Sequence, residues 1–206
     1  MYGPAQDDSL RSMTAPTRSQ VLAEAEYLIR RSGYSAFSYA HLTDKIGITK
    51  ASIHYHFPTK QRLAEEVVEV AMARFATALA GIEAEQGDAP ARLQRYGELF
   101  LDGFEEQLRP LCCALSAELA ALPDSIHART RAYFELHLAW LTRIVEAGVA
   151  AGQLCWADGA GALATLILST LEGGSLVARA MQSRALALAG FAQVLALAAP
   201  PAGGDT

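Results

Sequence analysis

Residues 38–63 read SYAHLTDKIGITKASIHYHFPTKQRL, and this stretch decides the fold. Ser38 can cap a short helix, and Gly47 can take the positive φ that ends it. Thr49 can cap a second short helix, which Pro58 stops because the residue before a proline is pushed out of the α region. Two short helices joined by a tight turn with a glycine predict a helix-turn-helix, whose second helix usually enters the major groove of DNA.

The second helix of this pair presents a polar outer face with no acidic residue. Its hydroxyl, imidazole and ammonium groups suit phosphate oxygens, and Lys and Ser side chains also reach base edges. Thr59 can cap the following helix, so that Lys60 and unpaired backbone N–H groups meet the same phosphate. The predicted DNA-binding residues are Ser38, Thr49, Lys50, Ser52, His54, Tyr55, His56 and Lys60. The expected inward-facing residues are Ala40, Leu42, Ile46, Ala51 and Ile53.

Residues 47–63, GITKASIHYHFPTKQRL, closely resemble the signature of the TetR family of bacterial transcriptional regulators. The resemblance extends over about residues 17–65. Two positions depart from the family pattern: His54 stands where Tyr is more usual, and Ala51 stands where Gly is frequent. The resemblance implies a regulator, most often a repressor, that binds a palindromic operator in double-stranded DNA as a homodimer. It also implies release from that operator by a small-molecule effector that the sequence does not identify.

The charge of the chain is divided unevenly along its length. Residues 1–62 hold eight Lys and Arg against five Asp and Glu, whereas the whole chain holds 17 basic and 22 acidic residues, for a net charge of −5. A basic amino-terminal part on an acidic body is expected of a DNA-binding head, because phosphate neutralisation supplies much of the affinity. A random fluctuation of charge is the alternative interpretation.

The head is predicted as three helices over residues 17–62, and the region before it as a disordered arm over residues 1–16. Thr17 and Gln20 match a capping box at the start of the first helix. The expected core of the head consists of Phe37, Leu42, Ile46, Ile53 and Phe57. The first residues lack the pattern of a signal peptide, and three cysteines do not make a secreted disulfide framework, so we expect a cytoplasmic protein.

Residues 63–200 predict a larger helical body for ligand binding and dimerisation, followed by a flexible tail over residues 201–206. Apolar spacing and breaks at Pro and Gly predict helices over about residues 59–84, 90–108, 111–122, 123–152, 158–179 and 182–198. With the head, this makes about nine helices without strand alternation, so the fold class is all-α. The first body helix has an apolar stripe of Leu63, Val67, Val70, Ala71, Phe75 and Leu79. Its other side carries Glu65, Glu66, Glu69 and Arg74.

The last two helices are rich in Ala, Leu and Gly, which permit close helix packing. The family resemblance implies that these helices from two protomers form a four-helix dimer interface. Such a dimer places its two recognition helices about 34–36 Å apart, one turn of DNA. The alternative is an ordinary intrachain core. The apolar tail is too short for a membrane span, and no membrane partner is expected.

An effector pocket is predicted in the body, because aromatic and polar residues recur there at helical spacing and the family often binds effectors between the corresponding helices. Its expected lining consists of Phe100, Phe104, Cys112, Tyr133, His137 and Trp140. The alternative is that the aromatic residues are core and His137 is structural. The Cys and His residues lack metal-binding spacing, so we expect neither a metal nor a cofactor.

Cys112 and Cys113 are redox candidates, because they stand near the start of a short helix where unpaired N–H groups can stabilise a thiolate. Some repressors that resemble TetR carry a cysteine hereabouts and respond to electrophiles or oxidants, so a thiol-based sensor is the alternative function. Packing residues are the alternative role for both cysteines. A cysteine hydrolase built from Cys112, a histidine and Glu118 is a remote alternative, because the chain lacks the motifs of such enzymes. We therefore predict a protein that is not an enzyme.

Overall fold

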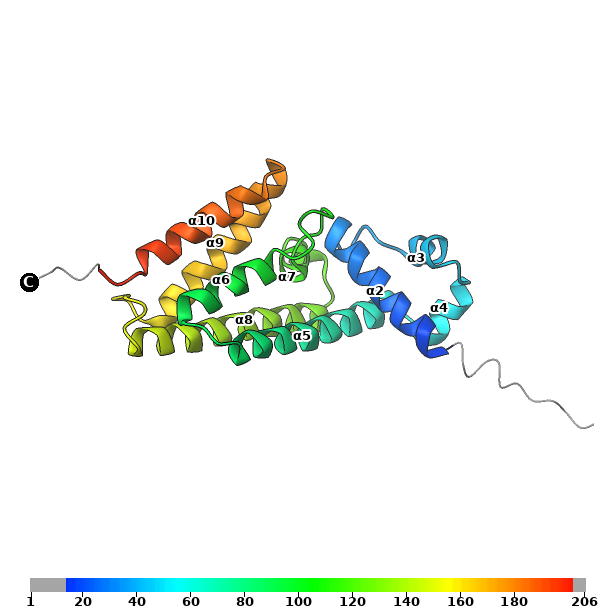
Figure 1. Ribbon diagram of the computed structural model, residues 1–206. Coiled ribbons are helices and arrows are strands. Elements are labelled where there is room, and N and C mark those ends of the chain that lie inside the picture. Colours follow the sequence, from blue (N-terminus) through cyan, green and yellow to red (C-terminus); the bar gives the residue numbers. More distant parts are fainter. Residues whose placement is uncertain (1–13, 202–206) are drawn as a thin grey trace, which may run out of the picture.

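The computed structural model describes residues 14–201, which form nine α-helices and no strand, as the all-α prediction requires. The head consists of three helices, α2 (Thr14–Ser32), α3 (Tyr39–Ile46) and α4 (Lys50–His56). It occupies one end of an elongated molecule, and α5 (Lys60–Ala84) runs from it into the body (Figure 1). Most of the predicted arm lies outside the described residues. The helix already begins at Thr14, so the predicted cap at Thr17 is wrong.

The turn chemistry of the head is confirmed at Gly47, Thr49 and Thr59. Gly47 ends α3 with a φ of 76°, in the left-handed region where glycine is favoured. Thr49 caps α4 by accepting a hydrogen bond from the backbone N–H of Ser52 at 3.2 Å. Thr59 caps α5 in the same way, with the N–H of Arg62 at 3.1 Å. Short polar side chains and one glycine therefore set the angles between three consecutive helices.

The core of the head contains four of its five predicted members, Phe37, Leu42, Ile53 and Phe57, whereas Ile46 is half-buried. The predictions for Ala40 and Ala51 are wrong, because both residues are exposed. In α3 the buried partner of Leu42 is Tyr39, three residues earlier on the same helix face. The Tyr39 hydroxyl donates to the carbonyl oxygen of Phe57 at 2.7 Å, which ties α3 to the end of α4.

The body contains six further helices. They are α5, α6 (Ala89–Phe100), α7 (Leu111–Ser116), α8 (Asp124–Ala150), α9 (Ala160–Ala180) and α10 (Arg184–Leu197). The predicted helix over residues 90–108 is too long, because the chain turns after Phe100 and Gly103 has a φ of 79°. The predicted helix over residues 111–122 is also too long, since α7 stops at Ser116 and a 3₁₀ turn follows at Leu119–Ala121.

Helix α5 packs against both α2 and α8, and this double contact changes its predicted stripe. Leu63, Val67, Ala71 and Leu79 are buried and Phe75 is half-buried. Val70, however, is 47% exposed, and Glu65 is buried although it was predicted on the polar side. A helix covered on two sides buries a wider arc than a single stripe, and this arc includes Glu65.

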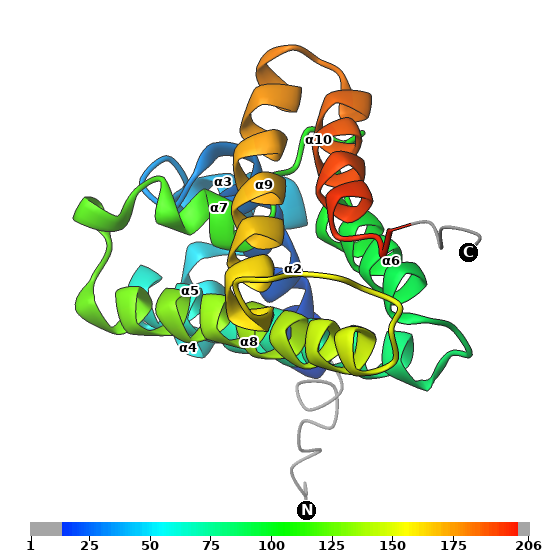
Figure 2. The ribbon, with the colours of Figure 1, turned by 90° about the vertical axis from the view of Figure 1, so that its left-hand side faces the viewer.

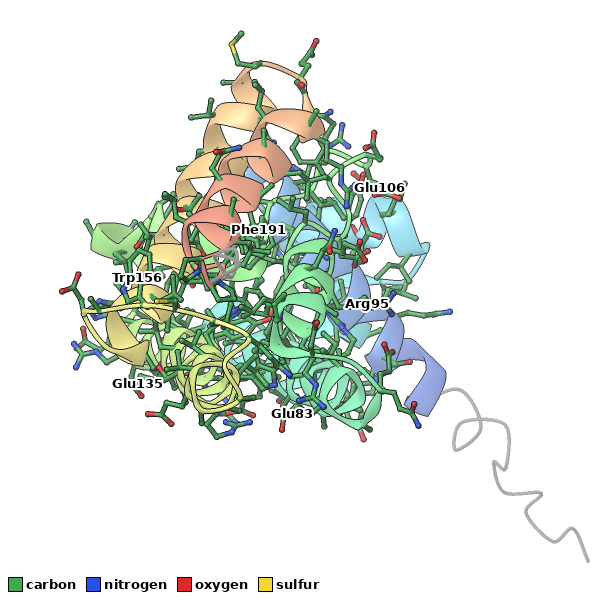
Figure 3. The ribbon with its side chains drawn as sticks, turned by 60° about the vertical axis from the view of Figure 1, so that its left-hand side comes forward. Glu83, Arg95, Glu106, Glu135, Trp156 and Phe191 are labelled. Carbon is green, nitrogen blue, oxygen red and sulfur yellow. The ribbon has the colours of Figure 1, made fainter. Side chains whose placement is uncertain are left out.

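Helices α9 and α10 pack side by side, standing across α8 (Figure 2). Helix α9 is long and apolar enough to cross a membrane, by length and composition only, and a third of that segment is buried inside the molecule. Phe191 of α10 turns inward against α6, where a Cβ on Gly97 would lie 2.4 Å from its ring (Figure 3). Glycine at position 97 thus allows α10 to close over α6.

Candidate DNA-binding face and ligand cavity

The outer face of α4 carries the predicted DNA-binding side chains. Those of Ser38, Thr49, Lys50, His54 and Tyr55 are exposed, and those of Ser52 and His56 are half-buried. Tyr55 is 79% exposed, which is unusual for a large aromatic side chain and leaves its ring and hydroxyl free for a partner. Because Ile53 anchors the helix from the opposite side, the polar groups are held on a short and well-fixed surface.

His54 is oriented by two contacts inside the head. Its Nδ1 lies 3.2 Å from the carbonyl oxygen of Pro58, and its ring meets the Tyr39 ring edge-on at 4.8 Å. Since a carbonyl oxygen only accepts, Nδ1 carries the proton in this contact. In the neutral ring, Nε2 is then the acceptor nitrogen, and protonation converts it into a second donor.

Lys60 differs from the other predicted DNA-binding residues. Its Nζ lies 4.5 Å from the ring centroids of Tyr34 and Phe37 and donates to the carbonyl oxygen of Ser35 at 3.4 Å. Burial lowers the pKa of this ammonium group, with nearby Glu118 acting in the opposite direction. In this conformation Lys60 binds the loop between α2 and α3, and the structure does not bring it to the outer face of α4.

The body contacts the back of the head through polar groups that the sequence analysis missed. Glu118 accepts a hydrogen bond from the backbone N–H of Ser35 at 2.8 Å. Arg30 of α2 donates to the carbonyl oxygens of Arg109 at 2.9 Å and Asp102 at 2.6 Å. These partners lie more than 70 residues apart in the chain, so no local pattern predicts them.

Glu65 is a buried carboxylate at the centre of a polar cluster where α5 meets the start of α8. Its carboxylate accepts from the Ser125 hydroxyl at 2.5 Å, from Arg62 at 2.8 Å and from Gln61 at 3.1 Å. The Ser125 hydrogen bond is the largest cause of a lowered Glu65 pKa, and burial opposes it. The signal in the sequence was an acidic residue next to an apolar stripe, which alone does not reveal a partner on another helix.

A cavity of about 220 Å³ lies between the head and the body. Its wall includes Phe100, Cys112, Tyr133 and His137, which are four of the six predicted pocket residues. Trp140 does not line it, because the indole stacks on Tyr96 in the core at 5.4 Å. Phe104 is also buried elsewhere.

The cavity wall also contains charged residues that were not predicted: Glu26, Arg30, Arg74 and Asp102. Arg74 of α5 binds Glu26 of α2 through two hydrogen bonds, of 2.6 and 3.1 Å. Arg30 lies 3.7 Å from the same carboxylate. Two of the cavity walls therefore belong to α2 of the DNA-binding head and to the helix that leaves it.

His137 is the buried polar group of the cavity. Its Nδ1 lies 2.7 Å from the Tyr96 hydroxyl, and its ring lies 4.3 Å from that of Phe75. Burial lowers the pKa of His137 to about 3, so the imidazole is neutral at physiological pH. Its Nε2 is buried without a hydrogen-bond partner among residues 14–201.

Cys112 and Cys113 are buried against Glu172 of α9, and both donate a hydrogen bond to its carboxylate. Burial, followed by the nearby Glu172 charge, raises the pKa of both thiols. Cys155 is exposed, and all three cysteines are free. Within the described part of the chain, no group of three or more His, Cys, Asp or Glu side chains could hold a metal ion. This environment stabilises thiols, not the reactive thiolate that a redox sensor or a hydrolase needs.

Both the sequence and the fold of this chain are similar to those of known transcriptional regulators. The family model for bacterial regulatory proteins of the tetR family matches residues 21–67. The chain is 31% identical to a transcriptional regulator of the TetR family from Agrobacterium tumefaciens, covering 89% of this chain and 98% of that one, with a TM-score of 0.85. A TetR transcriptional regulator from Legionella pneumophila is 29% identical over 88% of this chain and 97% of its own, with a TM-score of 0.82. A nucleoid occlusion factor SlmA from Marinobacter nauticus is 29% identical over 57% of this chain and 60% of that protein.

Proposed function

This chain belongs to the TetR family of bacterial regulators, and we propose that it is a homodimeric repressor that a small molecule releases from its operator. The family and the fold are those of transcriptional regulators and not of enzymes. The observation that carries the proposal is the position of the cavity, whose wall contains Glu26 and Arg30 of the head together with Arg74 of α5. A molecule that fills this cavity touches the elements that hold α4.

Binding to DNA is proposed for the outer face of α4, where Lys50, Tyr55 and their neighbours stand clear of the body. Lys50 supplies charge for a phosphate, and the hydroxyl and imidazole groups supply hydrogen bonds to phosphates and base edges. The capped ends of α4 fix the direction in which these groups point. Such a surface fits the major groove of DNA, because its polar groups match phosphates and base edges.

The homodimer is proposed to form through α9 and α10. These helices and the turn after α9 expose large apolar side chains, those of Leu166, Leu176, Val177, Met181, Leu186 and Leu197. Met181 and Leu197 are 65% and 70% exposed, which is costly in water for a protein that stays monomeric. A second copy packed on this face would cover them and would explain why α9 is apolar beyond what its own chain buries. A cytoplasmic location follows from this proposal.

The dimer has a direct test in Val177→Glu, which places a charge on the exposed side of α9. We expect this variant to be monomeric by size-exclusion chromatography with light scattering, and to lose operator affinity because two heads no longer bind together. Val70→Glu is the control, since Val70 is similarly exposed but lies on α5. Loss of the dimer in both variants, or in neither, contradicts the proposed interface.

Repression and release are tested on DNA fragments from the region upstream of the gene. The full-length protein should bind one fragment with a strong dependence on salt concentration, and an effector should lower that affinity about 5- to 150-fold, the usual range of allosteric coupling. Unchanged affinity with a ligand shown to occupy the cavity contradicts the release mechanism. The thiol-based alternative is not favoured, since burial and Glu172 keep Cys112 and Cys113 protonated.

A further inference from the structure

The cavity between head and body has a chemical character that narrows the choice of ligand. Phe75, Leu99 and Phe100 form apolar wall, together with small alanine side chains. A cavity of about 150 Å³ admits a benzene-sized molecule. The 220 Å³ found here therefore admits one aromatic ring with a short polar substituent.

The cationic hydrogen-bond donors of this cavity are the guanidinium groups of Arg30 and Arg74. The Tyr96 hydroxyl and Nδ1 of His137 share one hydrogen bond of 2.7 Å, in which either group can be the donor. Nε2 of His137 is buried without a hydrogen-bond partner among residues 14–201, and the Tyr133 side chain lines the cavity. Arg74 uses two of its five donors on Glu26. A ligand that binds the remaining donors of Arg74 must bring acceptor atoms.

The Glu26 carboxylate already occupies the position beside Arg74 that the carboxylate of an acidic ligand would take. Its two oxygens accept from the two terminal nitrogens of Arg74, the paired geometry in which a guanidinium binds a carboxylate. Arg74 is accessible from outside, because its side chain is 60% exposed, whereas that of Glu26 is 12% exposed. A ligand carboxylate that takes Arg74 leaves the Glu26 carboxylate beside Arg30, whose guanidinium lies 3.7 Å from it.

We propose that the cavity binds a small aromatic carboxylate, which displaces the Glu26 carboxylate from Arg74 while its ring lies against Phe75 and Phe100. This inference rests on the proposed function and gives the effector a chemical class. It also gives the effector a means of acting, because the Glu26–Arg74 pair joins α2 of the head to α5. A ligand that takes Arg74 breaks this link.

The experiment measures binding of benzoate, phenylacetate and 3-phenylpropanoate to the full-length protein by isothermal titration calorimetry. Benzamide and benzylamine serve as the neutral and cationic analogues. We expect at least one carboxylate to bind about tenfold or more tightly than both analogues, as a charged hydrogen bond implies. Equal or tighter binding of an analogue, or no binding of any of the three carboxylates, overturns the proposal.

Two variants change the carboxylate affinity in opposite directions. Arg74→Gln removes the anchor and should weaken binding about tenfold, whereas Glu26→Gln removes the internal competitor and should strengthen it. Arg143→Gln is the matched control, since Arg143 is 57% exposed, pairs with Glu83 at 2.6 Å and lies outside the cavity wall. Unchanged binding in both cavity variants, or weaker binding in Glu26→Gln, contradicts the exchange.

Operator binding is measured on the same samples, so that the carboxylate proposal and the repressor proposal are tested independently of each other. If the protein binds its operator and another class of molecule releases it, the carboxylate proposal is wrong and the repressor proposal stands. If a carboxylate binds as expected but no upstream fragment is bound, the repressor proposal fails by itself.

Discussion

The outer face of α4 and the region between head and body contain the same kinds of side chain in opposite surroundings. On α4, His54 and Lys50 lie in water, and their partners within the chain are few and local. In the interior, His137 and Glu65 are buried, and each has a hydrogen-bond partner on another helix, Tyr96 and Ser125 respectively. An exposed polar face is available to an external partner, whereas a buried polar group stabilises one arrangement of helices and is costly when its partner is lost.

The sharpest test of this contrast is the effect of acid on His137. Its pKa is about 3 in the folded protein and about 6.5 when unfolded, so the unfolded chain binds more protons between these values. The stabilisation is complete above pH 6.5 and is lost as the pH falls toward 3, at about 1.4 kcal/mol per pH unit and about 5 kcal/mol in total. Denaturant unfolding of the wild type and of His137→Gln between pH 7 and pH 4 measures this dependence.

The variant should show a flatter loss of stability with acid, because glutamine does not titrate. His127→Gln is the control, as His127 lies on the same helix and is exposed. Parallel pH profiles for the wild type and His137→Gln would show that the imidazole is not held neutral by burial. His137 would then not differ in this respect from the exposed side chains of α4.

The two regions also differ in how far the sequence predicts them. Ser38, Gly47, Thr49 and Thr59 act within four residues of their own positions, so the head followed from local turn and capping rules. The start of α2 was misplaced, because a capping pattern at Thr17 does not prevent a helix from beginning earlier. Local rules therefore locate short elements well and their outer ends less well.

The cavity could be predicted only in part. The spacing of Tyr133 and His137 on α8 placed both on one buried face, and both line the cavity. Trp140 has the same spacing but stacks on Tyr96 of α6, which periodicity cannot show. The charged wall was missed altogether, because Glu26 and Arg74 are 48 residues apart and read as solvent-exposed positions on their own helices.

A smaller effect is expected at Glu65, the buried carboxylate that joins α5 to α8. Glu65→Gln replaces one acceptor oxygen by an NH₂ group that faces the donors of Ser125, Arg62 and Gln61. Loss of hydrogen bonds to the buried side chain of residue 65 costs about 1–3 kcal/mol of unfolding free energy. Chemical denaturation at pH 7 measures this loss.

The Glu65 contribution also depends on pH in a defined direction. Because the folded pKa is lowered, the stabilisation is present above the unfolded pKa and is lost as the pH falls through the folded one, so the two proteins should converge in acid. Glu69→Gln is the control, since Glu69 pairs with Arg129 at 2.7 Å on an exposed surface. An equal loss in both variants would mean that burial adds nothing to the Glu65 cluster.

The smallest effect on the unfolding free energy is expected at Lys50, on the exposed face of α4. Its side chain is exposed and has no described role in folding, so Lys50→Ala should leave the unfolding free energy within about 0.5 kcal/mol of the wild type. Operator affinity should fall about tenfold, and the slope of log affinity against log salt should flatten by about two, one phosphate contact for each protomer. Arg143→Ala removes the same charge from α8 and should leave the slope unchanged. An equal loss of affinity in both variants would show that net charge, and not the position of Lys50 on α4, binds the DNA. The polar face of α4 would then not be a distinct DNA-binding site.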